Sequence, residues 1–471
     1  MKSLWLRLAL FASVAVFSIP ANSPAQEEKP AGELSGISFY RKIRPVLQRR
    51  CSGCHQPAKA GGELRLTSFE GFLKGGENGA GFVAGKPDES LVMNYITGDP
   101  PQMPLNDAPL SPEQIELIRQ WIAEGAHNDT PESITDTISE ENPPIYQSAP
   151  VVSALAYSPD GTLLAVSGFR EILVHKADGS GMAARLIGRS QRIESLAFSP
   201  DGKILAAVGG TPSLFGEVQF WDVETKKLTF SGTFANETLF GGSFSDDGTK
   251  FAFGGGDNSA RVLNVADGKQ IMRSDAHSDY VLGTTFSLQL DHLITVSRDM
   301  AMKLLIIENG QFVDNITSIT PGALKGGLTA VQRHPTQENV LIGGADGEPK
   351  LYQIFRTQKR VIGDDFNRIR GYPVLPGRIY SLQFNADGTR FVVGASTAVK
   401  GTARICDTEA GTVVHELKGI STPVYAVAYR PGGKEVAVAG FDGIVRFFNA
   451  ETGEAVREQI PVTITPTVAG Q

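Results

Sequence analysis

The sequence predicts a multidomain protein, in which a small all-α domain precedes an all-β domain built as a seven-bladed β-propeller. Two observations carry this prediction. Apolar residues recur at helical spacing within residues 37–127, whereas a Ser-Pro-Asp-Gly-like tetrapeptide recurs every 41 to 51 residues across 149–463. The chain has 471 residues, 41% of them hydrophobic and 20% charged, so it can bury both cores.

The charge balance argues against nucleic acid as a partner. Lys and Arg number 44 against 51 Asp and Glu, which gives a formal net charge of −7. A protein that grips phosphates needs a basic patch or a basic run, and the sequence has no long one. We therefore expect no nucleic acid partner.

The first 25 residues read as a signal peptide. Lys2 and Arg7 precede an apolar stretch, residues 8–19, which is shorter than the ~20 residues of a membrane-spanning helix. Small residues before Gln26 predict cleavage after Ala25, and an uncleaved N-terminal anchor is the alternative. No other stretch reaches spanning length, so we expect a periplasmic or otherwise exported protein without a transmembrane span in the mature chain.

The most specific short motif is Cys51-Ser52-Gly53-Cys54-His55. Two thiols at i and i+3 can bond the two vinyl groups of one haem, and the next residue then offers imidazole to the iron. A redox pair, a zinc half-site and an ordinary disulfide are the alternatives. A redox pair needs no His at this position, and a zinc site needs four ligands, whereas the chain has only one further cysteine, Cys406.

Two helices should frame this motif. Phe39, Ile43, Val46 and Leu47 have helical spacing and lead into Cys51, with Pro45 bending the helix or fixing a late start. The second helix begins with a capping box, Ser111 to Gln114, and ends before a glycine. Its apolar face, which includes Trp121, should pack on the first helix.

Three residues are candidates for the second axial ligand of the iron. Met93 lies in a short amphipathic helix and can equally be a core residue. Met103 lies between prolines, which keep the backbone extended and able to present a side chain. His127 follows the last helix. We favour Met103, with Met93 second and His127 third, because a rigid extended loop presents its side chain to the iron. A methionine sulfur would also raise the reduction potential relative to a second histidine.

Residues 37–127 resemble the planctomycete-type cytochrome c domain, a small secreted haem module. The resemblance implies one haem bonded to Cys51 and Cys54, with His55 and Met103 as axial ligands. Residues 103–106 depart from the family pattern, in which a second Pro or Gly and a Lys are commoner. The resemblance rests on Phe39, the Cys-His motif and segments 61–66, 74–79, 85–91, 103–104 and 110–126.

Five basic residues lie within the first helix, between and after its apolar positions: Arg41, Lys42, Arg44, Arg49 and Arg50. They can form a solvated face, pair with haem propionates, or steer an acidic redox partner toward the haem.

Residues 128–148 read as a linker, and the repeats follow it. The tetrapeptide or a degenerate copy begins at 158, 199, 245, 287, 334, 385 and 430, the spacing of four-stranded propeller blades. Its Asp-Gly supplies the positive φ of a tight hairpin. The repeats resemble WD-repeat propellers, with the Trp-Asp pair kept at Trp221 and Asp222. Residues 310–375 drift most from the pattern.

Several reactive residue types in the repeats have structural interpretations. Cys406 takes the Trp position of its blade and His175 the equivalent place in the first, so both should be buried fillers. His277, Ser297 and Asp299 could suggest a catalytic triad, but the WD resemblance implies that they hydrogen-bond to one another to tie a blade together.

The sequence thus predicts a secreted c-type cytochrome for single-electron transfer, with an unidentified redox partner protein and a propeller face that binds protein partners. A haem-dependent oxidoreductase with a small substrate in the propeller channel is the alternative. A structural scaffold with a vestigial haem is the third.

Overall fold

The computed structural model describes residues 36–105, 107–131, 138–320, 324–361 and 363–465. The expected signal peptide, residues 1–25, lies outside the described residues. Within the described part of the chain, no helix is long and apolar enough to cross a membrane.

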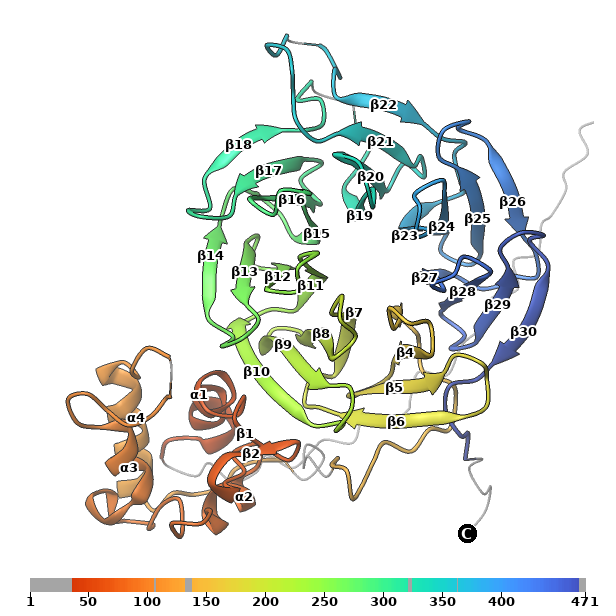
Figure 1. Cartoon of the computed structure of the whole chain (residues 1–471). Helices are drawn as coiled ribbons and strands as arrows, with labels where there is room; N and C mark the ends of the chain where they lie inside the picture. Colours follow the sequence, from red (N-terminus) through yellow and green to blue (C-terminus); the bar gives the residue numbers. More distant parts are fainter. Residues whose placement is uncertain (1–35, 106, 132–137, 321–323, 362, 466–471) are drawn as a thin grey trace, which may run out of the picture. The chain divides into compact units, whose positions relative to one another are not determined.

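Seven four-stranded antiparallel sheets form a ring (Figure 1). Each sheet uses four consecutive strands, with the first toward the centre of the ring and the fourth at its periphery. The seven-bladed β-propeller is therefore confirmed. The drifting repeat also forms a complete blade, β19 to β22.

The strands have the following bounds. Blades one to three contain β3 (Leu155–Tyr157), β4 (Leu163–Ser167), β5 (Glu171–Lys176), β6 (Met182–Ile187), β7 (Arg192–Phe198), β8 (Ile204–Thr211), β9 (Phe215–Asp222), β10 (Leu228–Ala235), β11 (Leu239–Phe244), β12 (Lys250–Gly255), β13 (Ala260–Asn264) and β14 (Gln270–Ser274). Blades four and five contain β15 (Val281–Phe286), β16 (His292–Ser297), β17 (Met302–Ile306), β18 (Phe312–Asn315), β19 (Leu328–Arg333), β20 (Asn339–Gly344), β21 (Lys350–Gln353) and β22 (Arg368–Gly371). Blades six and seven contain β23 (Arg378–Phe384), β24 (Arg390–Ser396), β25 (Gly401–Asp407), β26 (Val413–Leu417), β27 (Val424–Tyr429), β28 (Glu435–Gly440), β29 (Val445–Asn449) and β30 (Ala455–Gln459).

The repeated tetrapeptide closes the first hairpin of a blade, as expected. In the first blade, Ser158 Oγ donates to Asp160 Oδ1 at 2.5 Å and accepts from the N–H of Leu163 at 2.9 Å. Gly161 has φ +69°, a conformation in which a Cβ is strained. The hairpins at Ser199 and Ser245 repeat both hydrogen bonds.

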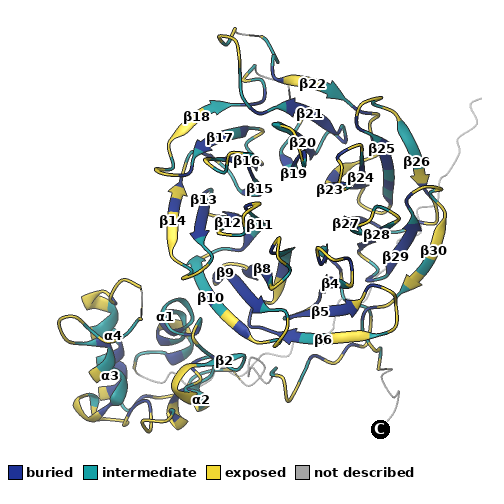
Figure 2. Cartoon of the chain, viewed as in Figure 1, coloured by how far each residue is buried: buried dark blue, intermediate teal, exposed yellow. Residues whose placement is uncertain are grey.

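The propeller core lies between adjacent blades. Third strands such as β5 and β9 are buried, whereas the outer strands β14 and β18 are largely exposed (Figure 2). In blades two to seven, the residues at the Trp position of the third strand are at most 1% exposed: Trp221, Leu263, Leu305, Tyr352, Cys406 and Phe448. The ring closes where β27 contacts β3 and the N–H of Val152 donates to the carbonyl of Gly440 at 2.9 Å.

The N-terminal region contains short helices but is not purely helical. Strand β1 (His55–Gln56) pairs with β2 (Lys59–Ala60), because the chain reverses directly after the cysteine motif. The prediction of an all-α domain is therefore only partly met. The helices are η1 (Phe39–Ile43), α1 (Arg44–Arg50), η2 (Gly61–Glu63), α2 (Phe69–Lys74), η3 (Pro87–Glu89), α3 (Leu91–Ile96) and α4 (Pro112–Ala123).

The two framing helices are confirmed. Pro45 lies in the first turn of α1, where its missing N–H is harmless, and the preceding residues form the wider π-helical turn η1. The capping box of α4 is present in both directions between Ser111 and Gln114. The helices pack through Phe39 and Trp121, whose ring centroids are 5.4 Å apart, and Phe69, Phe72 and Phe82 complete the aromatic cluster.

Candidate haem site

The cysteine motif forms a tight turn at the end of α1. The N–H groups of Cys51 and Ser52 both donate to the carbonyl of Leu47, and those of Cys54 and His55 donate to the carbonyl of Cys51. Ser52 is fully buried, and its Oγ lies 3.1 Å from the carbonyls of both Leu47 and Leu66. The turn therefore brings two thiols and an imidazole together within five residues of a well-anchored segment.

Both thiols of this turn are free. Cys51 is half-buried and Cys54 is exposed. Burial raises the pKa of the Cys51 thiol to about 12, against the smaller opposing effect of the Arg50 charge. Cys51 is therefore protonated at neutral pH, unlike the low-pKa nucleophile of a thiol redox pair.

The imidazole of His55 has the protonation state and the surroundings of a metal ligand. Burial lowers the pKa of its imidazole, although the nearby backbone of Gly61 and Leu64 opposes this, so the ring is neutral, the form that binds a metal. Its Nδ1 is buried and lacks a hydrogen-bond partner. Gly61 lies against the ring, because a Cβ there would be 3.6 Å from Cε1.

These observations fit a haem. Free thiols suit thioether formation, and a neutral imidazole with an unpaired buried nitrogen suits iron ligation. Among the described residues, no group of three or more His, Cys, Asp and Glu side chains is arranged to hold a metal ion.

The structure separates the candidates for the second axial ligand by their surroundings. Met93 is 2% exposed and belongs to the hydrophobic core with Phe39 and Trp121, so its side chain already has a structural role. Met103 is partly buried in the irregular loop between α3 and α4, where its N–H donates to the carbonyl of Tyr95 at 2.9 Å. His127 is exposed. Met103 therefore stays the preferred candidate.

The other reactive side chains have structural surroundings. Cys406 is fully buried, and burial raises the pKa of its thiol to about 12, which makes it unreactive. His175 is 5% exposed, and its two ring nitrogens hydrogen-bond to the side chain of Gln459 and to the carbonyl of Pro461.

Hydrogen bonds of His277 tie a blade together, but one of its partners differs from the expected one. His277 Nδ1 lies 2.8 Å from Asp299 Oδ2, and the N–H of Asp299 donates to Ser297 Oγ at 3.1 Å. The hydroxyl that meets His277 Nε2, however, belongs to Thr295, at 2.8 Å. Ser297 instead donates to the carbonyl of Asp279, so the expected direct contact between His277 and Ser297 is wrong. A triad pattern taken from sequence order could not reveal Thr295, whose side chain the register of β16 places next to the ring.

This tether makes part of the stability depend on pH. Burial alone would raise the pKa of Asp299, but the contact with His277 and two backbone N–H groups lowers it to about 2. Because the folded pKa is below the usual 3.8, the contribution is complete above pH 4 and is lost as the pH falls toward 2. We expect Asp299→Asn to cost about 1–2 kcal/mol at pH 7, allowing for solvent screening, and progressively less below pH 4 in denaturant titrations.

Asp291→Asn is the matched control for the tether, because Asp291 pairs with His292 but is 58% exposed. An exposed pair contributes little, so this variant should stay within about 0.5 kcal/mol of the parent. Equal losses in both variants at pH 7 would contradict the tether.

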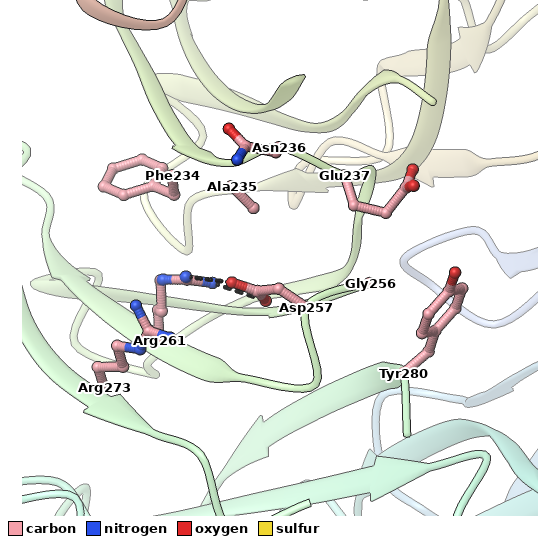
Figure 3. A pocket seen from close by; sticks show the side chains of 9 residues that line it. All are labelled: Phe234, Ala235, Asn236, Glu237, Gly256, Asp257, Arg261, Arg273 and Tyr280. Atoms are coloured by element: carbon pink, nitrogen blue, oxygen red, sulfur yellow. Dashed lines mark hydrogen bonds and ion pairs between the residues drawn. The ribbon is translucent and has the colours of Figure 1, made fainter. Parts of the chain in front are cut away.

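An open cavity of about 520 Å³ lies where the second, third and fourth blades meet (Figure 3). Two of its arginines are paired, Arg261 with Asp257 at 2.6 Å and Arg273 with Asp275 at 2.9 Å, and Glu237 accepts from the N–H groups of Ser213 and Thr238. The nine described residues that line it include no His, Cys or Ser.

The fold and the site together define a haem-binding type of module joined to a seven-bladed propeller. The family model of Planctomycete cytochrome C matches residues 51–106, and the model of the WD domain, G-beta repeat, matches residues 411–449. WD repeat-containing protein SL1-17 from Schistosoma mansoni is 33% identical over 78 residues. That match covers 17% of this chain and 25% of the relative, so it spans a quarter of the relative's length. The two family matches confirm the combination expected from the sequence.

Proposed function

We propose that this chain is an exported c-type cytochrome for single-electron transfer. One haem is joined to the sulfurs of Cys51 and Cys54, and His55 and Met103 are its axial ligands. The observation that carries the proposal is the turn after α1, which presents two free thiols and a neutral imidazole in consecutive order. The match of residues 51–106 to a cytochrome family supports it.

The haem, once bound, supplies an iron that cycles between two oxidation states, and the protein sets its potential. His55 would bind the iron, and its neutral ring would need no proton release to do so. Met103 would offer its thioether as the second ligand, and the hydrogen bond of its N–H to Tyr95 fixes the backbone that carries this side chain.

The proposed cytochrome-like domain comprises residues 37–127, followed by a linker at 128–148 and the propeller at 149–463. The proposed signal peptide at 1–25 would direct the mature chain to the periplasm or an equivalent exported location. The propeller serves as a surface for protein partners, since propellers that carry WD repeats commonly bind proteins. The redox partner is another protein, and the exposed Arg41 and Lys42 favour an acidic one.

Visible spectroscopy of methionine variants tests the ligand assignment. We expect the reduced parent protein to be low-spin, and the oxidised protein to show a sulfur-to-iron charge-transfer band. Met103→Ala should abolish the band and lower the reduction potential, because a thioether ligand raises it. Covalent haem content should stay unchanged.

Met93→Leu is the matched control, because this change nearly conserves volume in the core and costs less than about 1.5 kcal/mol. Its band should be intact. A band that survives Met103→Ala but disappears in Met93→Leu would move the assignment to Met93.

A further inference from the structure

Arg50 connects the cysteine turn to the loop that carries Met103. It is the last residue of α1 and directly precedes Cys51. Its Nη1 lies 3.2 Å from Asp107 Oδ2, and its Nη2 donates to the carbonyls of Ala108 and, at 3.5 Å, Pro109. The Arg50 side chain is 23% exposed and that of Asp107 is 54% exposed, so the ion pair is partly open to solvent and the two carbonyl contacts add to it.

Among the described residues between α3 and α4, contacts hold Met103 itself and residues 107–109. The N–H of Met103 itself donates to the carbonyl of Tyr95, near the end of α3. After it, Arg50 holds residues 107–109, and the next residue, Leu110, is 4% exposed in the core. The second anchor comes from the segment that carries the two thiols. Arg50 therefore links the cysteine turn to residues 107–109, which begin four residues after Met103.

We propose that Arg50 is a positioning residue that keeps Met103 in place as the distal ligand. The inference rests on the proposed function. A planar guanidinium suits this role, because it can engage a carboxylate and two carbonyls at once, whereas an ammonium group is a point charge. Removing a residue that orients a metal ligand commonly lowers the metal affinity or the activity of the site by 10–100-fold.

Imidazole binding to the oxidised, haem-loaded full-length protein tests this role, since imidazole competes with Met103 for the iron. We expect Arg50→Gln to bind imidazole at about tenfold lower concentration than the parent, with a weakened charge-transfer band. Arg50→Lys keeps the charge near Asp107 but loses the planar guanidinium with its several N–H donors. Its imidazole affinity should therefore lie between those of the parent and Arg50→Gln.

Arg49→Gln is the matched control. It removes the same charge one residue earlier, from a side chain whose Nε donates to the carbonyl of Pro45 within its own helix. Its imidazole affinity and band should equal those of the parent. Equal imidazole affinities in Arg50→Gln and Arg49→Gln, with covalent haem present in both, would overturn the role of Arg50. A parent protein without the charge-transfer band would instead overturn the assignment of Met103.

Discussion

Replacing Cys51 and Cys54 together with alanine is expected to leave the exported protein without covalently bound haem. The thioether bonds require these sulfurs, and both thiols of the turn are free to form them. Non-covalent retention through His55 and Met103 would not survive denaturation. The haem that remains with the polypeptide on a denaturing gel is the measurement, with the parent protein run beside the variant.

Cys406→Ala is the control for this loss, because Cys406 is the third free cysteine and is fully buried in the propeller. It should keep the full haem signal. Haem that stays with the denatured double variant, or that is lost from Cys406→Ala, would contradict attachment at Cys51 and Cys54.

The second large effect concerns propeller stability. Arg261 is 1% exposed, and its guanidinium is paired with Asp257 (Figure 3). The guanidinium also contacts Ser259. Asp257→Ala leaves a buried charge without its partner, which should cost about 3–5 kcal/mol in the free energy of unfolding. Denaturant titration followed by the far-ultraviolet signal of the sheets measures this.

Two comparisons make that measurement specific. Asp275→Ala breaks the neighbouring pair with Arg273, whose side chains are 48% and 63% exposed, so the cost should be below about 1 kcal/mol. Replacing the buried pair together, as Asp257→Ala with Arg261→Met, should recover much of the loss, because no unpaired charge remains. A double variant as unstable as Asp257→Ala would show that the loss does not come from the unpaired charge.

The propeller was predictable because its information is local and repeated. Each Ser-x-Asp-Gly hairpin uses hydrogen bonds that span only a few residues, as at Ser158, so the sequence reports them directly. The buried third-strand position tolerated Trp221, Tyr352 and Cys406, which a register argument can align despite their different chemistry. Even the drifting repeat kept its four strands.

The candidate site was predictable only where its residues are adjacent. The Cys-x-x-Cys-His spacing and the prolines around Met103 are visible in the sequence, and the structure adds that Met93 is in the core. The link between Arg50 and Asp107 joins residues far apart in the chain, and no periodicity reports such a pair. The β1–β2 hairpin was missed because two-residue strands carry no alternating pattern.

The most direct test of the account is the intact mass of the denatured protein, purified from the periplasm of a host that attaches haem to c-type cytochromes. We predict the mass of a polypeptide beginning at Gln26 plus that of one haem. A polypeptide with no added haem mass, from a host that loads a known c-type cytochrome in parallel, would contradict it.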